Sequence, residues 1–240
     1  MKPVALIQHT EVGAPGALAD ILRELGCETQ VFRVYLGDPI PNDAERFCGI
    51  VLLGGSMGVH DPLPWIADEL DLVRSADRLG LPLAGHCLGS QMLAFALGGT
   101  VGRHVRAEIG WTRIQAAATE PAREWWGEFA GGPITTFQWH QDTFTPPARA
   151  VPLATGEHCA SQAFVIDQRH LLVQSHLEIT PELVAATARK NGAQLQRQLA
   201  IGNPAVQPAD AMLRASPAAC VEANRALRRL YERWTQGCAR

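Results

Sequence analysis

The stretch LPLAGHCLGSQMLAFALGG, residues 81–99, joins a short apolar run to a helix-like segment through one cysteine. Cys87 has Gly85 two residues before it and Gly89 two residues after it. Glycine has no Cβ, so it allows the close backbone approach of a sharp turn. A thiol on such a turn lies over the start of a helix, where free N–H groups and the helix dipole favour the thiolate. The stretch predicts an exposed nucleophile, and a structural turn with an incidental cysteine is the alternative.

Apolar runs alternate with amphipathic segments on both sides of this turn. Strands alternating with helices predict an α/β fold with a mostly parallel, doubly wound central sheet flanked by helices. The acidic residues of the 65–79 segment lie early and its arginines late, as the helix dipole favours. The predicted strands are 4–8, 29–34, 49–53 and 81–85, and the predicted helices are 15–25, 65–79 and 88–97.

The pattern changes after residue 100. Short β-like pieces occur at 110–115, 133–141, 163–167 and 170–176, and helical periodicity returns from Pro181 to Trp234. We therefore expect one α/β domain over residues 1–190. Residues 191–240 are expected to form a C-terminal helical extension packed on the same domain.

A nucleophilic thiol needs a base and a group that orients the base. His176 follows the last β-like piece, and Glu178 lies two residues later. Residues i and i+2 of an extended segment project to the same side, so Glu178 can reach the imidazole of His176. The alternative is that His176 ends a strand and Glu178 begins the next helix.

A glycine pair ends the apolar run at residues 49–53. Gly54 and Gly55 could turn backbone N–H groups toward a ligand, which suits a second oxyanion donor beside the amide of Leu88. A plain turn is the alternative.

Bulk properties limit the classes of partner. The chain has 240 residues, 47% of them hydrophobic, and a formal net charge of -3, which gives no electrostatic case for nucleic acid or an anionic membrane. The first residues do not resemble a signal peptide, and no run approaches the roughly 20 apolar residues of a membrane span. A cytoplasmic protein is expected. The six cysteines form no CxxC pair, and His158-Cys159 has no partner at metal-ligand spacing, so neither a metal nor a cofactor is expected.

Three segments together resemble the class I (triad) glutamine amidotransferases: PLAGHCLGSQMLAFALGG (82–99), VLLGGS (51–56) and SHLE (175–178). LPWIADEL (63–70), EIGW (108–111) and WHQDTF (139–144) are closer to stand-alone members that are similar to the amidotransferase half of GMP synthetase. The resemblance implies a flavodoxin-like domain that attacks the side-chain amide of glutamine.

The resemblance also implies residue roles. Cys87 would be the nucleophile, His176 the base and Glu178 its orienting group, and a γ-glutamyl thioester would form. Gly55 and Leu88 would supply the oxyanion donors. The implied substrate-binding residues are Gln91, His140, Gln141 and Asp142.

Three positions depart from the family pattern. His86 replaces a small apolar residue, Leu177 replaces the proline of F-H-P-E, and Gln141 replaces the glycine of H-G-D. Loss of the proline predicts a less rigid His–Glu pair, and Gln141 puts a bulky side chain near the substrate loop.

The chain has no G-x-x-x-x-G-K-[ST] phosphate loop, so either a separate synthetase chain accepts the ammonia or the protein is a hydrolase. Three hypotheses follow. The chain is an amidotransferase-like enzyme that cleaves glutamine, a γ-glutamyl peptide hydrolase without an ammonia acceptor, or a non-catalytic regulatory homologue.

Overall fold

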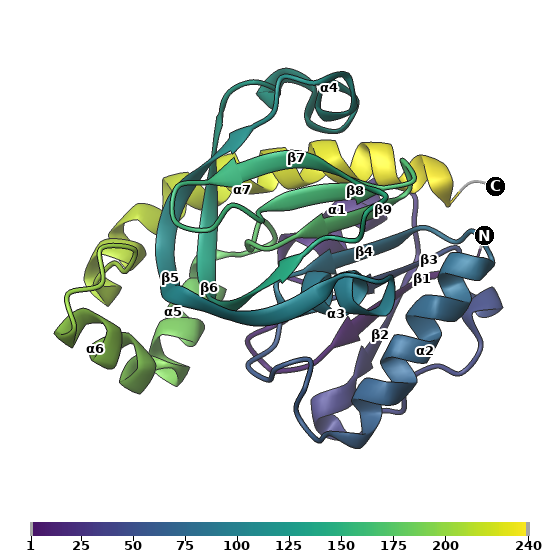
Figure 1. The fold of residues 1–240 in the computed structure, drawn as a ribbon, viewed down its shortest axis with the longest axis horizontal. Coiled ribbons are helices and arrows are strands. Elements are labelled where there is room, and N and C mark those ends of the chain that lie inside the picture. The colour runs from purple at the N-terminus through teal and green to yellow at the C-terminus, as the bar shows by residue number, and fades with distance from the viewer. Residues whose placement is uncertain (1, 239–240) are drawn as a thin grey trace.

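The computed structural model describes residues 2–238 and contains one nine-stranded mixed sheet (Figure 1). The strand order is β2-β1-β3-β4-β9-β8-β7-β5-β6. The strands are β1 (Val4–Gln8), β2 (Thr29–Arg33), β3 (Gly49–Leu52), β4 (Leu83–His86), β5 (Thr100–Ala116), β6 (Pro133–Thr145), β7 (Ala150–Gly156), β8 (Ala163–Ile166) and β9 (His170–Val173).

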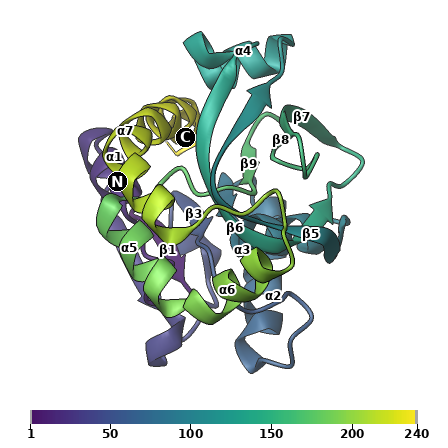
Figure 2. The same cartoon turned by 90° about the vertical axis from the view of Figure 1, so that its left-hand side faces the viewer.

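Helices cover both faces of the sheet, as the alternation of apolar runs and amphipathic segments predicts. They are α1 (Ala17–Glu24), α2 (Pro64–Arg78), α3 (Leu88–Ala96), α4 (Glu120–Trp126), α5 (Pro181–Lys190), α6 (Gly192–Ala200) and α7 (Ala209–Trp234), with short 3-10 turns at Val34–Leu36, Ala44–Arg46, Gly127–Phe129 and Thr235–Gly237. Figure 2 shows α1 and α7 on one side of the parallel strands and α2 and α3 on the other. None of the helices within residues 2–238 is long and apolar enough to cross a membrane.

Each parallel strand divides its side chains between two cores. In β1, Leu6 packs in the core under α1 and α7, whereas Ile7 packs in the core under α2 and α3. Successive strand residues point to opposite faces, and both faces are covered, so β1, β3 and β4 are almost continuously apolar apart from Gln8 and His86 at the ends of β1 and β4. This explains why β1, β3 and β4 could be predicted from short apolar runs.

The other half of the sheet corrects the expected mostly parallel arrangement. β1, β2, β3, β4 and β9 pair in parallel, but β8, β7, β5 and β6 pair antiparallel. β5 and β6 form a long curved ribbon (Figure 1). The register of this ribbon shifts between Arg103 and Glu108. Such an irregularity bends a ribbon, so the two ends of the ribbon can pack against different parts of the protein.

The first turn of α3 lies unusually close to the sheet. A Cβ on Gly89 would lie 2.0 Å from the carbonyl oxygen of Leu52 in β3, and a Cβ on Gly85 would lie 2.5 Å from the backbone of Gly89. Both neighbours are backbone atoms, which cannot rotate away. The glycine spacing in residues 85–89 is therefore a packing requirement of the strand-to-helix turn.

We expect Gly89→Ala to lower the free energy of unfolding by about 1 to 3 kcal/mol or more, because the added methyl overlaps backbone. Gly102→Ala is the matched control, since a Cβ at Gly102 meets no atom within 4 Å. Urea denaturation of both variants measures the difference. Equal losses would contradict the close approach of α3 to β3.

His170 in β9 is a buried neutral imidazole. Its Nδ1 accepts a hydrogen bond from the N–H of Leu83 at 3.2 Å, and its Nε2 donates to Asp77 at 2.9 Å. Burial lowers the pKa of His170 to about 4, and the partial compensation by Asp77 does not restore it. Arg149 pairs with Asp77 and with Asp167 in the same group.

The folded-state pKa of His170 lies below its usual 6.5, so the unfolded chain binds the extra proton between pH 6.5 and pH 4. We expect the free energy of unfolding to fall by about 3 kcal/mol as the pH is lowered through this window. Urea titrations at several pH values measure this slope. His170→Gln should flatten it, and His60→Gln, at an exposed histidine, should not. An unchanged slope in His170→Gln would contradict a buried neutral His170.

Candidate active site

Cys87 occupies a strained backbone position between β4 and α3. Its φ is 50° and its ψ is −112°, and within residues 2–238 only Asp167 and Gln168 also combine a side chain with positive φ. The Cys87 N–H donates to the carbonyl of Val173 in β9 at 2.9 Å, which fixes the turn to the sheet. Such backbone strain costs about 1 to 3 kcal/mol and is concentrated at functional sites. The thiol is thus held at the N-terminus of α3, and its sulfur lies 3.9 Å from the carbonyl oxygen of Trp139.

His176 and Glu178 lie across from this thiol on the segment after β9. The Nδ1 of His176 is 2.7 Å from Oε1 of Glu178, as the i, i+2 spacing predicts. The N–H of His176 donates to the carbonyl of Phe137 in β6 at 2.8 Å. A Cβ on Gly54 would lie 2.6 Å from Cε1 of His176, so the glycine leaves room for the imidazole. The alternative in which Glu178 begins a helix is wrong, because α5 begins at Pro181 after its N-cap Thr180.

The backbone around Glu178 is fixed from two helices. Asn224 in α7 donates its amide to the carbonyl of Leu177 at 2.6 Å and to that of Ile179 at 3.1 Å. The carbonyl of Glu178 accepts from the N–H of Ala17 at the start of α1 at 2.9 Å. Leu177 is fully buried. These contacts restrain the segment in which Leu177 replaces the family proline.

His86 extends the polar chain beyond Glu178. Its Nδ1 lies 3.1 Å from Oε2 of Glu178, an ion-pair distance at an angle that does not make a hydrogen bond. Its Nε2 is 2.8 Å from the hydroxyl of Tyr231 in α7, and the two rings stack. Both His86 and Tyr231 are fully buried. The carboxylate of Glu178 therefore lies between two imidazoles, one of them tied to the C-terminal helix.

Neighbouring charges shift the pKa values of both His176 and Glu178. Burial alone would lower the pKa of His176, but Glu178 and Cys87 raise it well above its usual value. Burial alone would raise the pKa of Glu178, but His86 and His176 lower it far below the usual range. Glu178 is therefore ionised at neutral pH. A thiolate at Cys87 would face a positively charged imidazole.

A buried ion pair supports the glycine turn after β3. The Nδ1 of His9 is 2.9 Å from the carbonyl of Leu53, and its Nε2 is 2.9 Å from both carboxylate oxygens of Glu69. Because both nitrogens face acceptors, His9 is an imidazolium. Burial lowers its pKa, and Glu69 more than compensates, so the pKa of His9 is raised. A Cβ on Gly55 would lie 3.1 Å from Cβ of His9 and 2.6 Å from Cδ2 of Leu88, so the two predicted oxyanion residues are neighbours.

A cleft of about 230 Å³ opens in front of Cys87 and His176, and its volume suits a small ligand. Gln91 and Asp142 line it, but the amide of Gln91 is already engaged. Gln91 Nε2 donates to the carbonyl of Asp142 at 2.9 Å and to Gln174 at 3.3 Å. This bonding fixes the segment of β6 that carries the Asp142 carboxylate, so the predicted substrate loop His140–Asp142 is part of a strand.

The other predicted substrate residues have different orientations. The side chain of Gln141 accepts from Arg103 at 2.7 Å and donates to the carbonyl of His104 at 3.3 Å, so its bulk is tied to β5. The imidazole of His140 is buried and bonds to Glu108 and to the carbonyl of Asp142. His140 therefore stabilises its own segment of β6 through the hydrogen bond to the carbonyl of Asp142.

Sequence reasoning missed the cationic rim of this cleft. Arg103 from β5 and Lys190 from the end of α5 line it, and both are exposed. Trp139 forms another part of the wall, and its indole donates to Gln194 of α6 at 2.9 Å. No local signal marks these residues, because the ribbon and the C-terminal helices meet only in the fold.

We expect Glu178→Gln to lower the pKa of His176 by about 1 to 3 pH units, because the substitution removes an opposite charge in direct contact. NMR titration of the His176 ring protons measures the change. Glu182→Gln, at a glutamate on the next helix that is not buried, is the control. The ion pair would be refuted if both variants titrated like the wild type.

Comparisons with known proteins show the family of the chain. Residues 12–193 match the family model for glutamine amidotransferase class-I. A solved glutamine amido transferase from Methylobacillus flagellatus is 35% identical, with a TM-score of 0.93 over 99% of this chain and 95% of that one. Gamma-glutamyl peptidase 3 of Arabidopsis thaliana is 27% identical over 74% of both chains. One component of the glutamine-hydrolysing GMP synthase of Thermoplasma volcanium is 29% identical over 66% of this chain and 75% of that one. The chain belongs to the class I glutamine amidotransferase family.

Proposed function

We propose that the chain hydrolyses the side-chain amide of glutamine, or of a related γ-glutamyl compound, with Cys87 as nucleophile, His176 as base and Glu178 as its orienting group. The observation that carries the proposal is the strained Cys87 turn at the N-terminus of α3, facing the His176–Glu178 pair in a cleft. A nucleophile, a base and an oriented carboxylate in this order form a catalytic triad.

The first half of the reaction forms a thioester. The Cys87 thiolate attacks the γ-carbonyl carbon, and the oxygen of that carbonyl takes up the negative charge. The N–H of Leu88, at the first turn of α3, and the N–H of Gly55 would stabilise this oxyanion. The C–N bond then breaks as His176 gives its proton to the departing nitrogen, which releases ammonia and leaves a γ-glutamyl thioester on Cys87.

The second half restores the enzyme. His176 takes a proton from water, and the resulting hydroxide attacks the thioester carbonyl. The C–S bond breaks, glutamate leaves, and Cys87 and His176 regain the thiolate and the imidazolium. Glu178 remains ionised throughout and holds Nδ1 of His176, so that Nε2 is the nitrogen available for the proton transfers.

The cleft also suggests how the amino-acid end of the substrate is held. The carboxylate of Asp142 would pair with the α-ammonium group, and Arg103 or Lys190 would pair with the α-carboxylate. Opposite charges at a fixed separation favour a zwitterionic γ-glutamyl group over a simple amide.

Hydrolysis of γ-glutamyl peptides is the second candidate, and it uses the same chemistry with a larger leaving amine. The relation to gamma-glutamyl peptidase 3 supports it. The hydrogen bond between Arg103 and the Gln141 side chain is also a contact that a glycine at position 141 could not make. The relation to a GMP synthase component supports the first candidate, with a separate synthetase chain as ammonia acceptor.

We expect wild-type protein to release glutamate from glutamine or from a γ-glutamyl dipeptide, and Cys87→Ala to lower kcat by at least about 10⁴-fold. Assays of glutamine and a panel of γ-glutamyl dipeptides compare the two substrate classes directly. Release from glutamine favours the amidotransferase reading, and release from dipeptides alone favours the peptide hydrolase.

Cys220→Ser is the control for loss of a buried thiol, since Cys220 lies in α7 away from the cleft. It should keep the wild-type rate. Glutamate release that survives in Cys87→Ala would refute the proposed nucleophile. No release from any compound would favour the non-catalytic homologue.

A further inference from the structure

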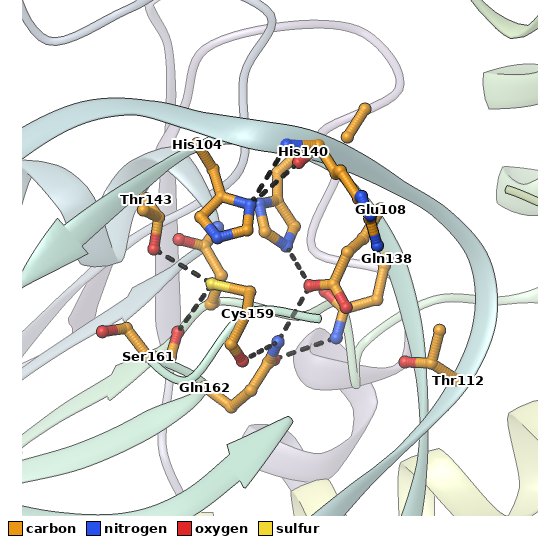
Figure 3. Close-up of polar contacts among 12 residues, drawn as sticks. His104, Glu108, Thr112, Gln138, His140, Thr143, Cys159, Ser161 and Gln162 are labelled. Carbon is orange, nitrogen blue, oxygen red and sulfur yellow. Dashed lines mark hydrogen bonds and ion pairs between the residues drawn. The ribbon is translucent and has the colours of Figure 1, made fainter. Parts of the chain in front are cut away.

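A cluster of side chains of the metal-binding types lies at the His140–Asp142 segment of β6, apart from the catalytic residues. Glu108 from β5, His140 from β6 and Cys159 from the loop between β7 and β8 converge there, and all three are buried (Figure 3). Their ligand atoms all lie within 4.8 Å of one another. Glu108 and His140 are direct partners in the β5–β6 register, whereas Cys159 comes from a separate loop. The fold thus gives Cys159 neighbours that no spacing in the sequence shows.

His140 already has the orientation of a metal-binding histidine. Its Nδ1 lies 3.0 Å from the carbonyl oxygen of Asp142, which can only accept, so Nδ1 carries a proton. Its Nε2 lies 2.9 Å from Oε2 of Glu108. Metal-binding histidines usually donate their second ring nitrogen to a carbonyl or carboxylate in this way. The Asp142 carbonyl thus fixes Nε2 toward the centre of the cluster.

The carboxylate of Glu108 is held by a chain of amides. Gln162 donates to Oε2 of Glu108 at 3.0 Å, and Gln138 donates to Gln162 at 2.9 Å (Figure 3). The remaining oxygen of Gln138, Oε1, is buried and has no hydrogen-bond partner among residues 2–238. An unpaired buried acceptor is costly unless a donor or a cation satisfies it. The amide chain that holds Glu108 therefore contains one buried acceptor that is free to bind a further donor or a cation.

Cys159 supplies a thiol that the active site does not use. Its sulfur is 3.1 Å from Oγ1 of Thr143 in β6. The thiolate is the metal-binding form of cysteine, so the proton of this thiol leaves when a cation binds.

We propose that Glu108, His140 and Cys159 bind one divalent transition-metal ion of the Zn²⁺ type. One carboxylate oxygen, one imidazole nitrogen and one thiolate suit a tetrahedral ion with a fourth position for the Gln138 oxygen or water. Donors bound at about 2.0 to 2.3 Å are about 3.3 to 3.8 Å apart in a tetrahedron. The present separations, all within 4.8 Å, are of the same order as these distances.

The net charge of the cluster is the same before and after the ion binds. Before binding, the cluster holds a thiol and one proton shared by His140 and Glu108, with no net charge. Binding replaces these two protons with one ion of charge +2, so the buried site stays neutral. The cost of burying an isolated charge is therefore avoided. Two protons leave for each ion bound.

The proposed metal site would act on the His140–Asp142 segment of β6 through one backbone oxygen. The carbonyl of Asp142 accepts from His140 on one side and from Gln91 of α3 on the other. A bound ion fixes His140, so it also fixes Asp142 at the wall of the active-site cleft. Metal occupancy and the position of Asp142 are therefore coupled.

Titration of chelator-treated protein with Co²⁺ tests the site without measuring catalysis. We expect one ion per chain, tetrahedral visible bands and a sulfur-to-cobalt charge-transfer band in the near ultraviolet. Cys159→Ser should abolish that band and weaken binding at least about 100-fold, the upper range for loss of even an outer-shell partner. Calorimetry with Zn²⁺ in buffers of different ionisation enthalpy should give two protons released per ion.

Two variants separate this site from other thiols. Cys87→Ser removes the active-site thiol and Cys220→Ser removes a buried thiol of α7, and both should keep the cobalt spectrum of the wild type. Gln162→Leu removes the amide that holds Glu108, and we expect it to weaken binding by about 10- to 100-fold. A wild-type spectrum without the sulfur band, a band that survives in Cys159→Ser, or a band lost in Cys87→Ser would overturn the proposal.

Discussion

The close contact of α3 with the centre of the sheet is the constraint on which the site depends. Gly89 lies against the carbonyl of Leu52, and Gly85 lies against the first turn of the same helix. A helix that starts so close to the strand end leaves no room for an ordinary turn, so Cys87 takes a positive φ. The strain is borne by the packing of β3, β4 and β9 around it. The thiol position thus follows from backbone packing rather than from contacts of the thiol itself.

Buried pairs of imidazole and carboxylate form a second theme. His9 pairs with Glu69, His140 with Glu108, and Glu178 with both His176 and His86. Each pair joins different elements, apart from His176 with Glu178. A buried charge without its partner is strongly destabilising, so each pair that joins two elements fixes their relative position. These pairs fix the glycine turn after β3, the His140–Asp142 segment of β6 and the turn that carries Cys87.

Local patterns made the parallel strands, the Cys87 turn and the His176–Glu178 pair predictable, because each lies within a few residues of sequence. Glu69 could not be assigned, since it stands between Asp68 and Asp71 in a helix and looks like an exposed acid, yet it is fully buried. β7 was missed because Pro152 lies inside it. The cluster of Glu108, His140 and Cys159 has no linear signal, since it forms only when the β5–β6 ribbon folds against a distant loop.

Helix α7 fixes the positions of the residues that these local patterns predict. Asn224 brackets Glu178 by holding the carbonyls on either side of it, and Tyr231 holds the imidazole that faces its second oxygen. Trp234 donates to the carbonyl of Leu83 in β4, two residues into the run that ends at Cys87. One face of α7 therefore contacts both the strand before the nucleophile and the segment of the base. A family proline restricts such a segment through its own ring, whereas here hydrogen bonds from α7 provide the restriction, so the geometry of the base depends on the docking of residues that a triad motif does not include.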